Sequence, residues 1–240
     1  MEIFVILTQA VEHLPFLIFI ATSTFFCFLL LLFFPRFWSA ILFALNGSVD
    51  PTQNPHSNLP SGAGLVFSSV YIIAGLIFQS AGYNFLERAD LFFYLAPLFV
   101  MSVAGFLDDI CELPWFPRLV FYFLTSLCFV ALTQPSGLLS ALEPQNFSII
   151  SLSVSVFLLL WMTNLYNFMD GIDGLAASQA IFVLLSVSLI SLIFGKSTPS
   201  PFLFFLIGPL IGFLVLNLPK AKILMGDSGS IFLGFFFGIT

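Results

Sequence analysis

Charged side chains are scarce in this sequence. Asp, Glu, Lys and Arg together make up 8% of the 240 residues, whereas soluble domains carry about a quarter. Hydrophobic residues make up 60% of the chain, and its mean hydropathy is +1.11. Water therefore cannot be the solvent for most of this surface, and a soluble globular domain is excluded.

Basic residues and cysteines are also few. Six Lys and Arg against twelve Asp and Glu give a net charge of −6, without the basic cluster that nucleic-acid binding needs. The three cysteines, Cys27, Cys111 and Cys128, lack metal-ligand spacing and are interpreted as small packing side chains. Glu2 and Glu12 stand where a signal peptide would be basic, so we do not expect a cleavable one.

Long apolar runs recur along the whole chain, several of them close to the ~20 residues that span a bilayer. In lipid the backbone must bond within its own segment, which favours helices, and the alternating pattern of barrel strands is not seen. We predict an all-α, polytopic membrane helix bundle that forms a single domain over residues 1–240. The predicted spans are 14–34, 63–82, 91–107, 118–133, 149–165, 175–194, 202–217 and an eighth that begins near Ile231.

Most of the polar residues fall in connections that should share one membrane face. If the chain crosses the bilayer once per span, connections 35–62, 108–117, 166–174 and 218–230 lie together. The positive-inside rule favours a cytoplasmic location for this face. It carries Arg36, Arg118, Lys220 and Lys222, and the opposite face carries Arg88 and Lys196.

Two adjacent carboxylates, Asp108 and Asp109, end the third predicted span. An Asp at the bilayer centre costs roughly 2.5–3.5 kcal/mol. Two like charges ~6 Å apart repel by about 3 kcal/mol at an effective dielectric constant near 20. A bound cation, a raised pKa or solvent exposure would relieve that repulsion. A solvated pair of helix-end charges is the simpler alternative.

A second polar cluster occupies residues 164–176. Its polar residues recur at every third position, as on one face of a helix. Gly171 and Gly174 predict that the helix opens into a loop and restarts at Leu175. Asp-Gly is a common turn signal, but this density of polar groups in so apolar a chain favours a functional site. The recurring residues are Asn164, Asn167, Asp170 and Asp173.

A third cluster, residues 217–230, runs into the last apolar stretch. Asp227, Ser228 or Ser230 can cap the following helix, whose free N–H groups suit an anion such as phosphate. Asp227 would repel phosphate unless a divalent metal lies between them. An ordinary N-cap beside interfacial Lys220 and Lys222 is the alternative.

A fourth cluster, residues 55–64, leads into the second predicted span. It contains His56, Ser57, Gly62 and Gly64, and a glycine-rich turn at a helix start can approach a phosphate closely. An ordinary loop is an equally good interpretation of this cluster alone.

Together the clusters place five aspartates on one face with few cations. Hard oxygen ligands of this kind suit Mg²⁺ or Mn²⁺, and Mg²⁺ commonly takes one or two carboxylates together with substrate phosphates. The aspartates are Asp108, Asp109, Asp170, Asp173 and Asp227.

At these residues the chain resembles the polyprenyl-phosphate N-acetylhexosamine-1-phosphate transferases. That superfamily includes phospho-MurNAc-pentapeptide translocase and the enzymes that prime O-antigen, teichoic acid and enterobacterial common antigen synthesis. The matching segments are Asp108-Asp109, residues 164–176, Asn217 with Pro219, and residues 225–230.

The resemblance implies a role for each residue. Asp227 corresponds to the Mg²⁺ ligand, and Asp108 and Asp109 to the pair at the acceptor phosphate. Asp170 corresponds to a further active-site carboxylate and Asp173 to a contact with the uridine end. The remaining substrate-binding residues would be Asn164, Asn167, Asn217, His56, Ser57, Gly62 and Gly64.

The implied reaction moves a sugar-1-phosphate, with N-acetylglucosamine-1-phosphate as the default, from a UDP-N-acetylhexosamine to undecaprenyl phosphate. UMP is released, and synthesis of a cell-envelope polysaccharide such as O-antigen begins. The expected location is the inner membrane of a bacterium, with the site facing the cytoplasm.

Two departures from the family pattern leave alternatives open. Ser61 stands where the first loop usually has Arg, and the chain stops at Thr240, before the family's His-rich C-terminal loop and last spans. We therefore expect a C-terminally truncated member, for which a catalytically inactive remnant is one alternative. A membrane cation transporter is another, although it would place acids near mid-span.

Overall fold

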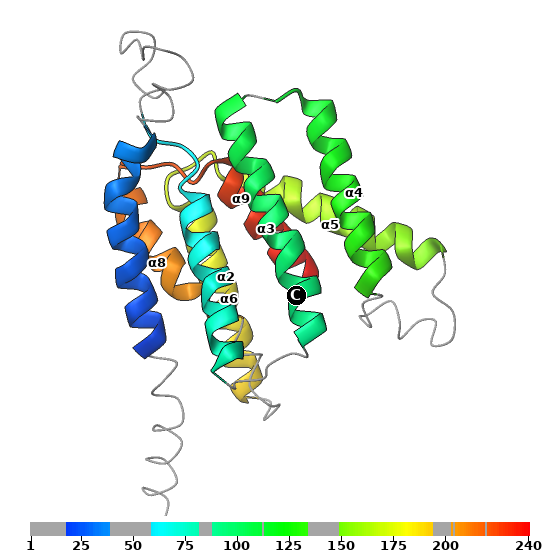
Figure 1. Cartoon of the computed structure of the whole chain (residues 1–240), viewed down its shortest axis with the longest axis horizontal. Coiled ribbons are helices and arrows are strands. Elements are labelled where there is room, and N and C mark those ends of the chain that lie inside the picture. The colour runs from blue at the N-terminus through cyan, green and yellow to red at the C-terminus, as the bar shows by residue number, and fades with distance from the viewer. Residues whose placement is uncertain are drawn as a thin grey trace, which may run out of the picture.

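The protein is described by a computed structural model, over residues 18–38, 59–81, 88–111, 113–133, 149–193, 203, 205–218 and 220–240. These residues form eight helices, one for each predicted span, so the helical architecture is confirmed (Figure 1). They are an N-terminal helix Ile18–Trp38, α2 Gly64–Ser80, α3 Arg88–Cys111, α4 Trp115–Thr133, α5 Ile149–Met169, α6 Leu175–Ile193, α8 Ile207–Asn217 and α9 Gly226–Ile239.

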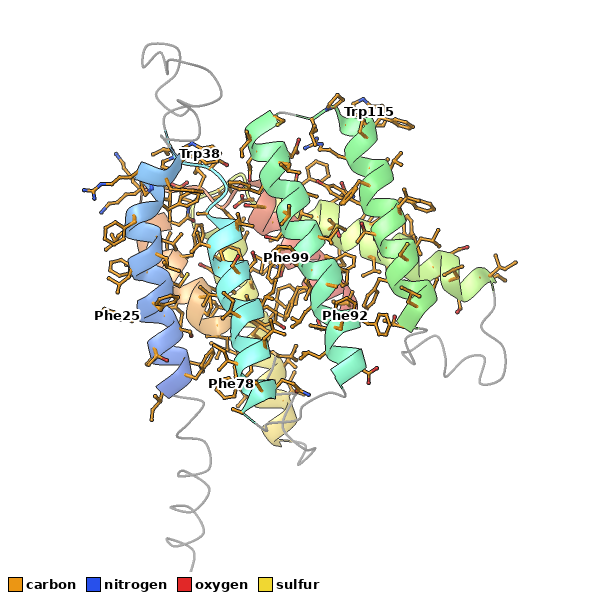
Figure 2. All side chains as sticks on the ribbon, in the orientation of Figure 1. Phe25, Trp38, Phe78, Phe92, Phe99 and Trp115 are labelled. Atoms are coloured by element: carbon orange, nitrogen blue, oxygen red, sulfur yellow. The ribbon has the colours of Figure 1, made fainter. Side chains whose placement is uncertain are left out.

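Four of these helices are long and apolar enough to cross a membrane: Ile18–Trp38, Asp90–Cys111, Trp115–Thr133 and Ile149–Met169. The other described helices are apolar but shorter. Large apolar side chains point outward around the bundle; Phe25 is 63% exposed and Phe92 is 67% exposed (Figure 2). This is the surface expected when the surroundings are lipid rather than water.

The short helix α9 forms the centre of the bundle. Every residue from Ser228 to Phe236 is buried, and α9 packs against α2, α3 and α5. Figure 1 shows it behind α3, between α2 and α5. A helix that is apolar all round belongs in a core, so the sequence of α9 suits this place.

Glycines allow α9 to approach its neighbours closely. A Cβ on Gly64 of α2 would overlap the Gly229 backbone, and one on Gly105 of α3 would overlap the Asp227 backbone. On the other side of α9, a Cβ on Gly234 would overlap the backbone of α5 at Thr163. Small residues at helix contacts are characteristic of membrane bundles, where close packing replaces the hydrophobic effect.

Three of the helix boundaries that differ from those predicted bear on the polar clusters. Helix α3 continues to Cys111 and therefore contains Asp108 and Asp109, which were predicted to begin a connection. Helix α5 continues to Met169 and contains Asn167. Helix α9 begins at Gly226 rather than near Ile231, because Asp109 of α3 accepts hydrogen bonds from its first backbone amides.

Candidate active site

Carboxylates from outside α9 bind the first backbone amides of that helix. The N–H of Asp227 donates to Asp109 Oδ1 at 2.9 Å, and the N–H of Ser228 donates to Asp109 Oδ2 at 3.1 Å. The N–H of Gly226 donates to Asp170. The first amides of a helix have no partner within the helix and attract negative charge, so these carboxylates start α9 at Gly226.

This arrangement corrects two predictions for the third cluster. None of Asp227, Ser228 and Ser230 is the N-cap, because all three lie inside α9; the N-cap is Met225, which makes no side-chain cap bond. Asp109 and Asp170, rather than an external phosphate, bind the first amides. Gly226 has a φ of 71°, and a Cβ there would lie 2.5 Å from both Asp109 carboxylate oxygens. Glycine is therefore required at this turn.

The segment before α2 is held against the same turn. Ser61 Oγ donates to Asp109 Oδ1 at 3.1 Å. The Gly64 amide donates to the Met225 carbonyl at 2.9 Å, so it is already bonded within the protein. Gly62, with a φ of 86°, packs beside Phe106 and Asp109. His56 and Ser57, from the same predicted cluster, lie outside the described residues.

Asp108 faces a different partner. Arg118, in the first turns of α4, uses Nη1 to bond Asp108 Oδ2 and also Asp227 Oδ2, the latter at 2.9 Å. Asp108 Oδ1 accepts the Leu113 amide at 2.7 Å, and Asp108 is only 5% exposed. One guanidinium thus draws together a carboxylate of α3 and a carboxylate of α9.

The two predicted amides of α5 have different environments. Asn167 Nδ2 donates to Asp227 Oδ1 at 2.8 Å and to Ser230 Oγ at 3.2 Å, so this side chain orients Asp227. Asn164 Nδ2 donates to the Leu160 carbonyl of its own helix at 2.7 Å.

The remaining polar residues join the α5–α6 loop to the segment before α9. Asn217 is 5% exposed; its Oδ1 accepts the Gly174 amide at 2.6 Å and its Nδ2 donates to the Ile223 carbonyl at 2.8 Å. Asp173 Oδ2 accepts the Ala221 amide at 3.0 Å. Asn217 therefore holds two loops together, a role that its sequence motif did not indicate.

Burial raises the pKa of Asp170 to about 7, and the negative charges of Asp109 and Asp227 add to that rise. The bond from the Gly226 amide acts in the opposite direction. Asp170 therefore gains and loses a proton near neutral pH, the range in which a carboxyl group can act as an acid or a base.

The two carboxylates nearest the polar cavity are chemically suitable ligands for a divalent cation. Asp108 Oδ2 and Asp227 Oδ2 both bond Arg118 Nη1, and carboxylate oxygens are the hard ligands that Mg²⁺ prefers. Within the described ranges there is no group of three or more His, Cys, Asp or Glu side chains that could hold a metal. Two carboxylates suit Mg²⁺, which commonly takes its other ligands from phosphate and water.

A cavity of about 230 Å³ opens beside this cluster, between α4, α5 and α9. Its wall includes Arg118 of α4 on one side and the polar side chains of α5 on the other. Its lining includes Trp115, Arg118, Tyr122, Asn164, Asn167 and Phe168.

Comparison with known proteins identifies the family of this chain. The sequence model of glycosyl transferase family 4 matches residues 91–240. The chain belongs to glycosyl transferase family 4. Among its relatives are three enzymes named phospho-N-acetylmuramoyl-pentapeptide-transferase. The enzyme from Leuconostoc citreum is 28% identical over 78% of this chain and 62% of its own length. The enzyme from Streptococcus thermophilus is 30% identical over 73% of this chain and 56% of its own length. The enzyme from Helicobacter acinonychis is 30% identical over 79% of this chain and 61% of its own length.

The match to glycosyl transferase family 4 includes all five aspartates of the predicted site. This chain spans 56–62% of the length of these three relatives. Ser61 and α2, which support Asp109 and α9, precede the segment that the family 4 model matches.

Three residues of this candidate site were not predicted as site residues. Arg118 was predicted only to add positive charge to the polar face, although an arginine soon after two adjacent carboxylates is a usable signal. Tyr122 lies one helical turn after Arg118 and lines the same cavity. Ser61 was noted only because it departs from the family pattern, and its bond to Asp109 could not be read from its position.

Proposed function

We propose that this chain forms the active centre of a membrane transferase that moves a sugar-1-phosphate from a UDP-sugar to undecaprenyl phosphate. The observation that carries the proposal is the bridge from Arg118 to Asp108 and Asp227, with Asn167 orienting Asp227. It assembles oppositely charged groups at the end of an apolar bundle, where a water-soluble diphosphate and a lipid phosphate can meet. Membership of glycosyl transferase family 4 supports the same reaction class.

Asp227 and Asp108 are the residues that would hold Mg²⁺, or Mn²⁺ in its place. When bound, the ion supplies positive charge against the diphosphate of the donor. Asn167 fixes the orientation of the Asp227 carboxylate, and side chains that orient a metal ligand in this way commonly strengthen metal binding.

The proposed reaction is a single displacement at phosphorus. An oxygen of the lipid phosphate forms a bond to the β-phosphorus of the UDP-sugar, and the bond from that phosphorus to the bridging oxygen breaks, so UMP leaves with the electron pair. A phosphate monoester has a second pKa of about 6, so the acceptor is largely ionised at neutral pH and needs little help from a protein base. Positioning and charge then carry most of the catalysis.

The protein's own residues provide that positioning. Asp109, supported by Ser61, fixes the start of α9 and therefore the location of Asp227. Asn217 holds the α5–α6 loop beside the segment that leads into α9.

The preferred donor is UDP-N-acetylglucosamine or a related UDP-N-acetylhexosamine. The names of the relatives favour a second candidate, a donor that carries phospho-N-acetylmuramoyl-pentapeptide. We place the protein in the inner membrane of a bacterium with its site facing the cytoplasm, at the first step of an envelope polysaccharide such as O-antigen.

A donor screen tests the proposal. Membranes that contain the chain are given undecaprenyl phosphate, Mg²⁺ and a radiolabelled donor, and the label is followed into organic solvent. We expect transfer from one donor, loss of transfer with EDTA, and a fall on the order of 10²-fold for Asp227→Asn. Matched membranes with Asp90→Asn, a substitution at the opposite end of α3, serve as the control.

The outcomes separate the alternatives. Folded protein that transfers sugar-1-phosphate from neither donor would favour the catalytically inactive remnant. Transfer that survives both EDTA and Asp227→Asn would exclude the metal role. Cation flux in sealed vesicles without transfer would favour a transporter.

A further inference from the structure

Arg118 lies where a cation that bridges Asp108 and Asp227 would have to bind. Its Nη1 bonds Oδ2 of both carboxylates, the one on Asp227 at 2.9 Å. A magnesium ion held by the same two oxygens would be about 2.1 Å from each, so it would need the space that this nitrogen fills. Asp108 is only 5% exposed, which leaves its Oδ2 little surface for an ion to approach from elsewhere. The guanidinium and the ion therefore compete for one position.

Charge adds to this competition. A guanidinium keeps its positive charge in proteins and has no acceptor atom with which to bind a metal. A divalent cation that approached the paired carboxylates would therefore be repelled at close range. Arg118 also offsets part of the negative charge of Asp108 and Asp227, so this pair attracts a free cation less than two unpaired carboxylates would.

The two carboxylates are also held in place by groups other than Arg118. Asp227 Oδ1 accepts the side-chain amide of Asn167 at 2.8 Å, and Asp108 Oδ1 accepts the backbone amide of Leu113 at 2.7 Å. These bonds use the two oxygens that Arg118 does not bond. The carboxylates would therefore keep their positions if the guanidinium moved, and their Oδ2 atoms would become available together.

The surroundings of Arg118 allow it to move. It lies near the start of α4, its side chain is 33% exposed, and it lines the polar cavity of about 230 Å³ beside Asn167. Movement alone would leave two carboxylates without their cation, which is unfavourable. Movement becomes favourable when an anion takes the guanidinium and a cation takes the carboxylates in the same event. A diphosphate that carries a divalent metal ion supplies both, and a planar guanidinium suits phosphate oxygens.

We propose that Arg118 closes the Asp108–Asp227 pair to a free cation and opens it when a metal–diphosphate complex arrives. The diphosphate takes the guanidinium, and the metal ion that it carries takes the two carboxylates. The site then accepts its donor as a metal complex and holds little metal between turnovers. This inference rests on the proposed function, because it describes how the donor of that reaction enters.

Metal binding tests the inference without requiring turnover. Radioactive Mn²⁺ bound to the purified full chain in detergent is measured by equilibrium dialysis, with UDP, with uridine or with neither on both sides of the membrane. The wild type should bind Mn²⁺ roughly 5–150-fold more tightly with UDP than without it, the usual size of coupling between two ligands. Uridine, which has no phosphate, should give no gain. Arg118→Gln should bind Mn²⁺ alone more tightly than the wild type by a similar factor, and UDP should then add much less.

Matched variants identify the origin of that gain. Lys222→Gln also removes a positive charge, but from an exposed side chain that bonds neither carboxylate among the described contacts, so it should change Mn²⁺ affinity little. Arg118→Lys keeps a positive charge and should keep Mn²⁺ binding weak. Adding Asp227→Asn to Arg118→Gln should abolish the gain, because it removes one of the two proposed ligands.

The reactivity of Arg118 provides a second measurement. Phenylglyoxal modifies accessible guanidinium groups, and peptide mass spectrometry reports the modification of each arginine separately. Mn²⁺ at saturating concentration should displace Arg118 by mass action and speed its modification several-fold, whereas Mn²⁺ with UDP should protect it again. Arg36, which is exposed on the N-terminal helix, is the internal reference and should react at the same rate throughout.

The outcomes separate this inference from the proposed function. Sugar transfer by the wild type, with Mn²⁺ binding to Arg118→Gln no tighter than to the wild type, would overturn the inference and leave the transferase standing. Tighter Mn²⁺ binding to Arg118→Gln that Asp227→Asn reverses, without transfer from any donor, would support the inference and contradict the transferase. Equal gains from Arg118→Gln and Lys222→Gln would overturn the inference, because general charge would then explain both. Size-exclusion profiles and thermal unfolding of each variant establish that it is folded.

Discussion

Asp108 and Asp109 are neighbours in α3, yet their carboxylates bind different parts of the molecule. Asp109 accepts the amides of Asp227 and Ser228 at the start of α9, whereas Asp108 is paired with Arg118 beside the polar cavity. The predicted catalytic pair therefore has two roles in the structure. Asp109 positions α9, and Asp108 faces the groups that can meet a substrate.

This division predicts different effects for the two asparagine substitutions. Asp109→Asn presents an N–H₂ donor to amides that need acceptors, so it should lower the free energy of unfolding by about 1–3 kcal/mol. Asp108→Asn should change stability less but lower transfer on the order of 10²-fold. The two variants are compared by thermal unfolding in detergent and by the transfer assay, both measured on the same preparations. If Asp109→Asn unfolds like the wild type and loses only activity, the division of roles is wrong.

Asn167 should control metal affinity more than donor affinity. It bonds Asp227 Oδ1, so Asn167→Ala should raise the Mg²⁺ concentration for half-maximal transfer by roughly 10–100-fold. Asn164→Ala, whose amide bonds only its own helix among the described contacts, should instead raise the KM for the donor. Ser153→Ala, on the exposed side of α5, is the control. A Mg²⁺ titration unchanged by Asn167→Ala would argue against Asp227 as a ligand.

The raised pKa of Asp170 predicts a pH dependence of stability. Its pKa is about 7 in the folded protein and about 3.9 in an unfolded chain, so between these values the folded state binds more protons. Asp170 therefore contributes stability at low pH that is lost as the pH rises towards 7. Thermal unfolding from pH 5 to pH 8 should show this decline in the wild type.

Asp170→Asn provides the comparison for that decline. The substitution removes the titrating group and keeps a carbonyl oxygen for the Gly226 amide, so the slope between pH 5 and pH 7 should flatten. Equal slopes in the two proteins would mean that another group is responsible.

Close packing around α9 predicts that Gly105 tolerates substitution far less than Gly171 does. A Cβ on Gly105 would overlap the Asp227 backbone, which no side-chain movement relieves. Gly105→Ala should therefore cost about 1–3 kcal/mol of stability and displace Asp227, with a loss of transfer. Gly171→Ala is the matched control, because the nearest atom to a Cβ there is the Phe168 carbonyl oxygen at 3.9 Å. Similar melting temperatures for the two variants would contradict the packing described here.

Much of the architecture could be predicted from the sequence because membrane helices follow local rules. Apolar runs separated by polar connections located all eight described helices. The break after Met169 and the restart at Leu175 followed from Gly171 and Gly174. Family 4 membership was also anticipated from the polar motifs.

The details of the site depended on contacts between distant segments. The start of α9 was predicted too late because its cap, Asp109, comes from another helix. Arg118 is one of six basic residues in the sequence, and its selection follows from its place between Asp108 and Asp227. The role of Asn217 likewise depends on two loops that meet only in the folded chain.

The sequence by itself determined the lipid environment, the helical fold and the residue types available for chemistry, because composition and apolar run length report burial in a bilayer. Only the tertiary structure decided which aspartates stabilise α9, which face Arg118 and where the cavities lie. Helix periodicity places a side chain on a face of its own helix, but its partner depends on how helices pack, and the glycines of α2, α3 and α9 set that packing.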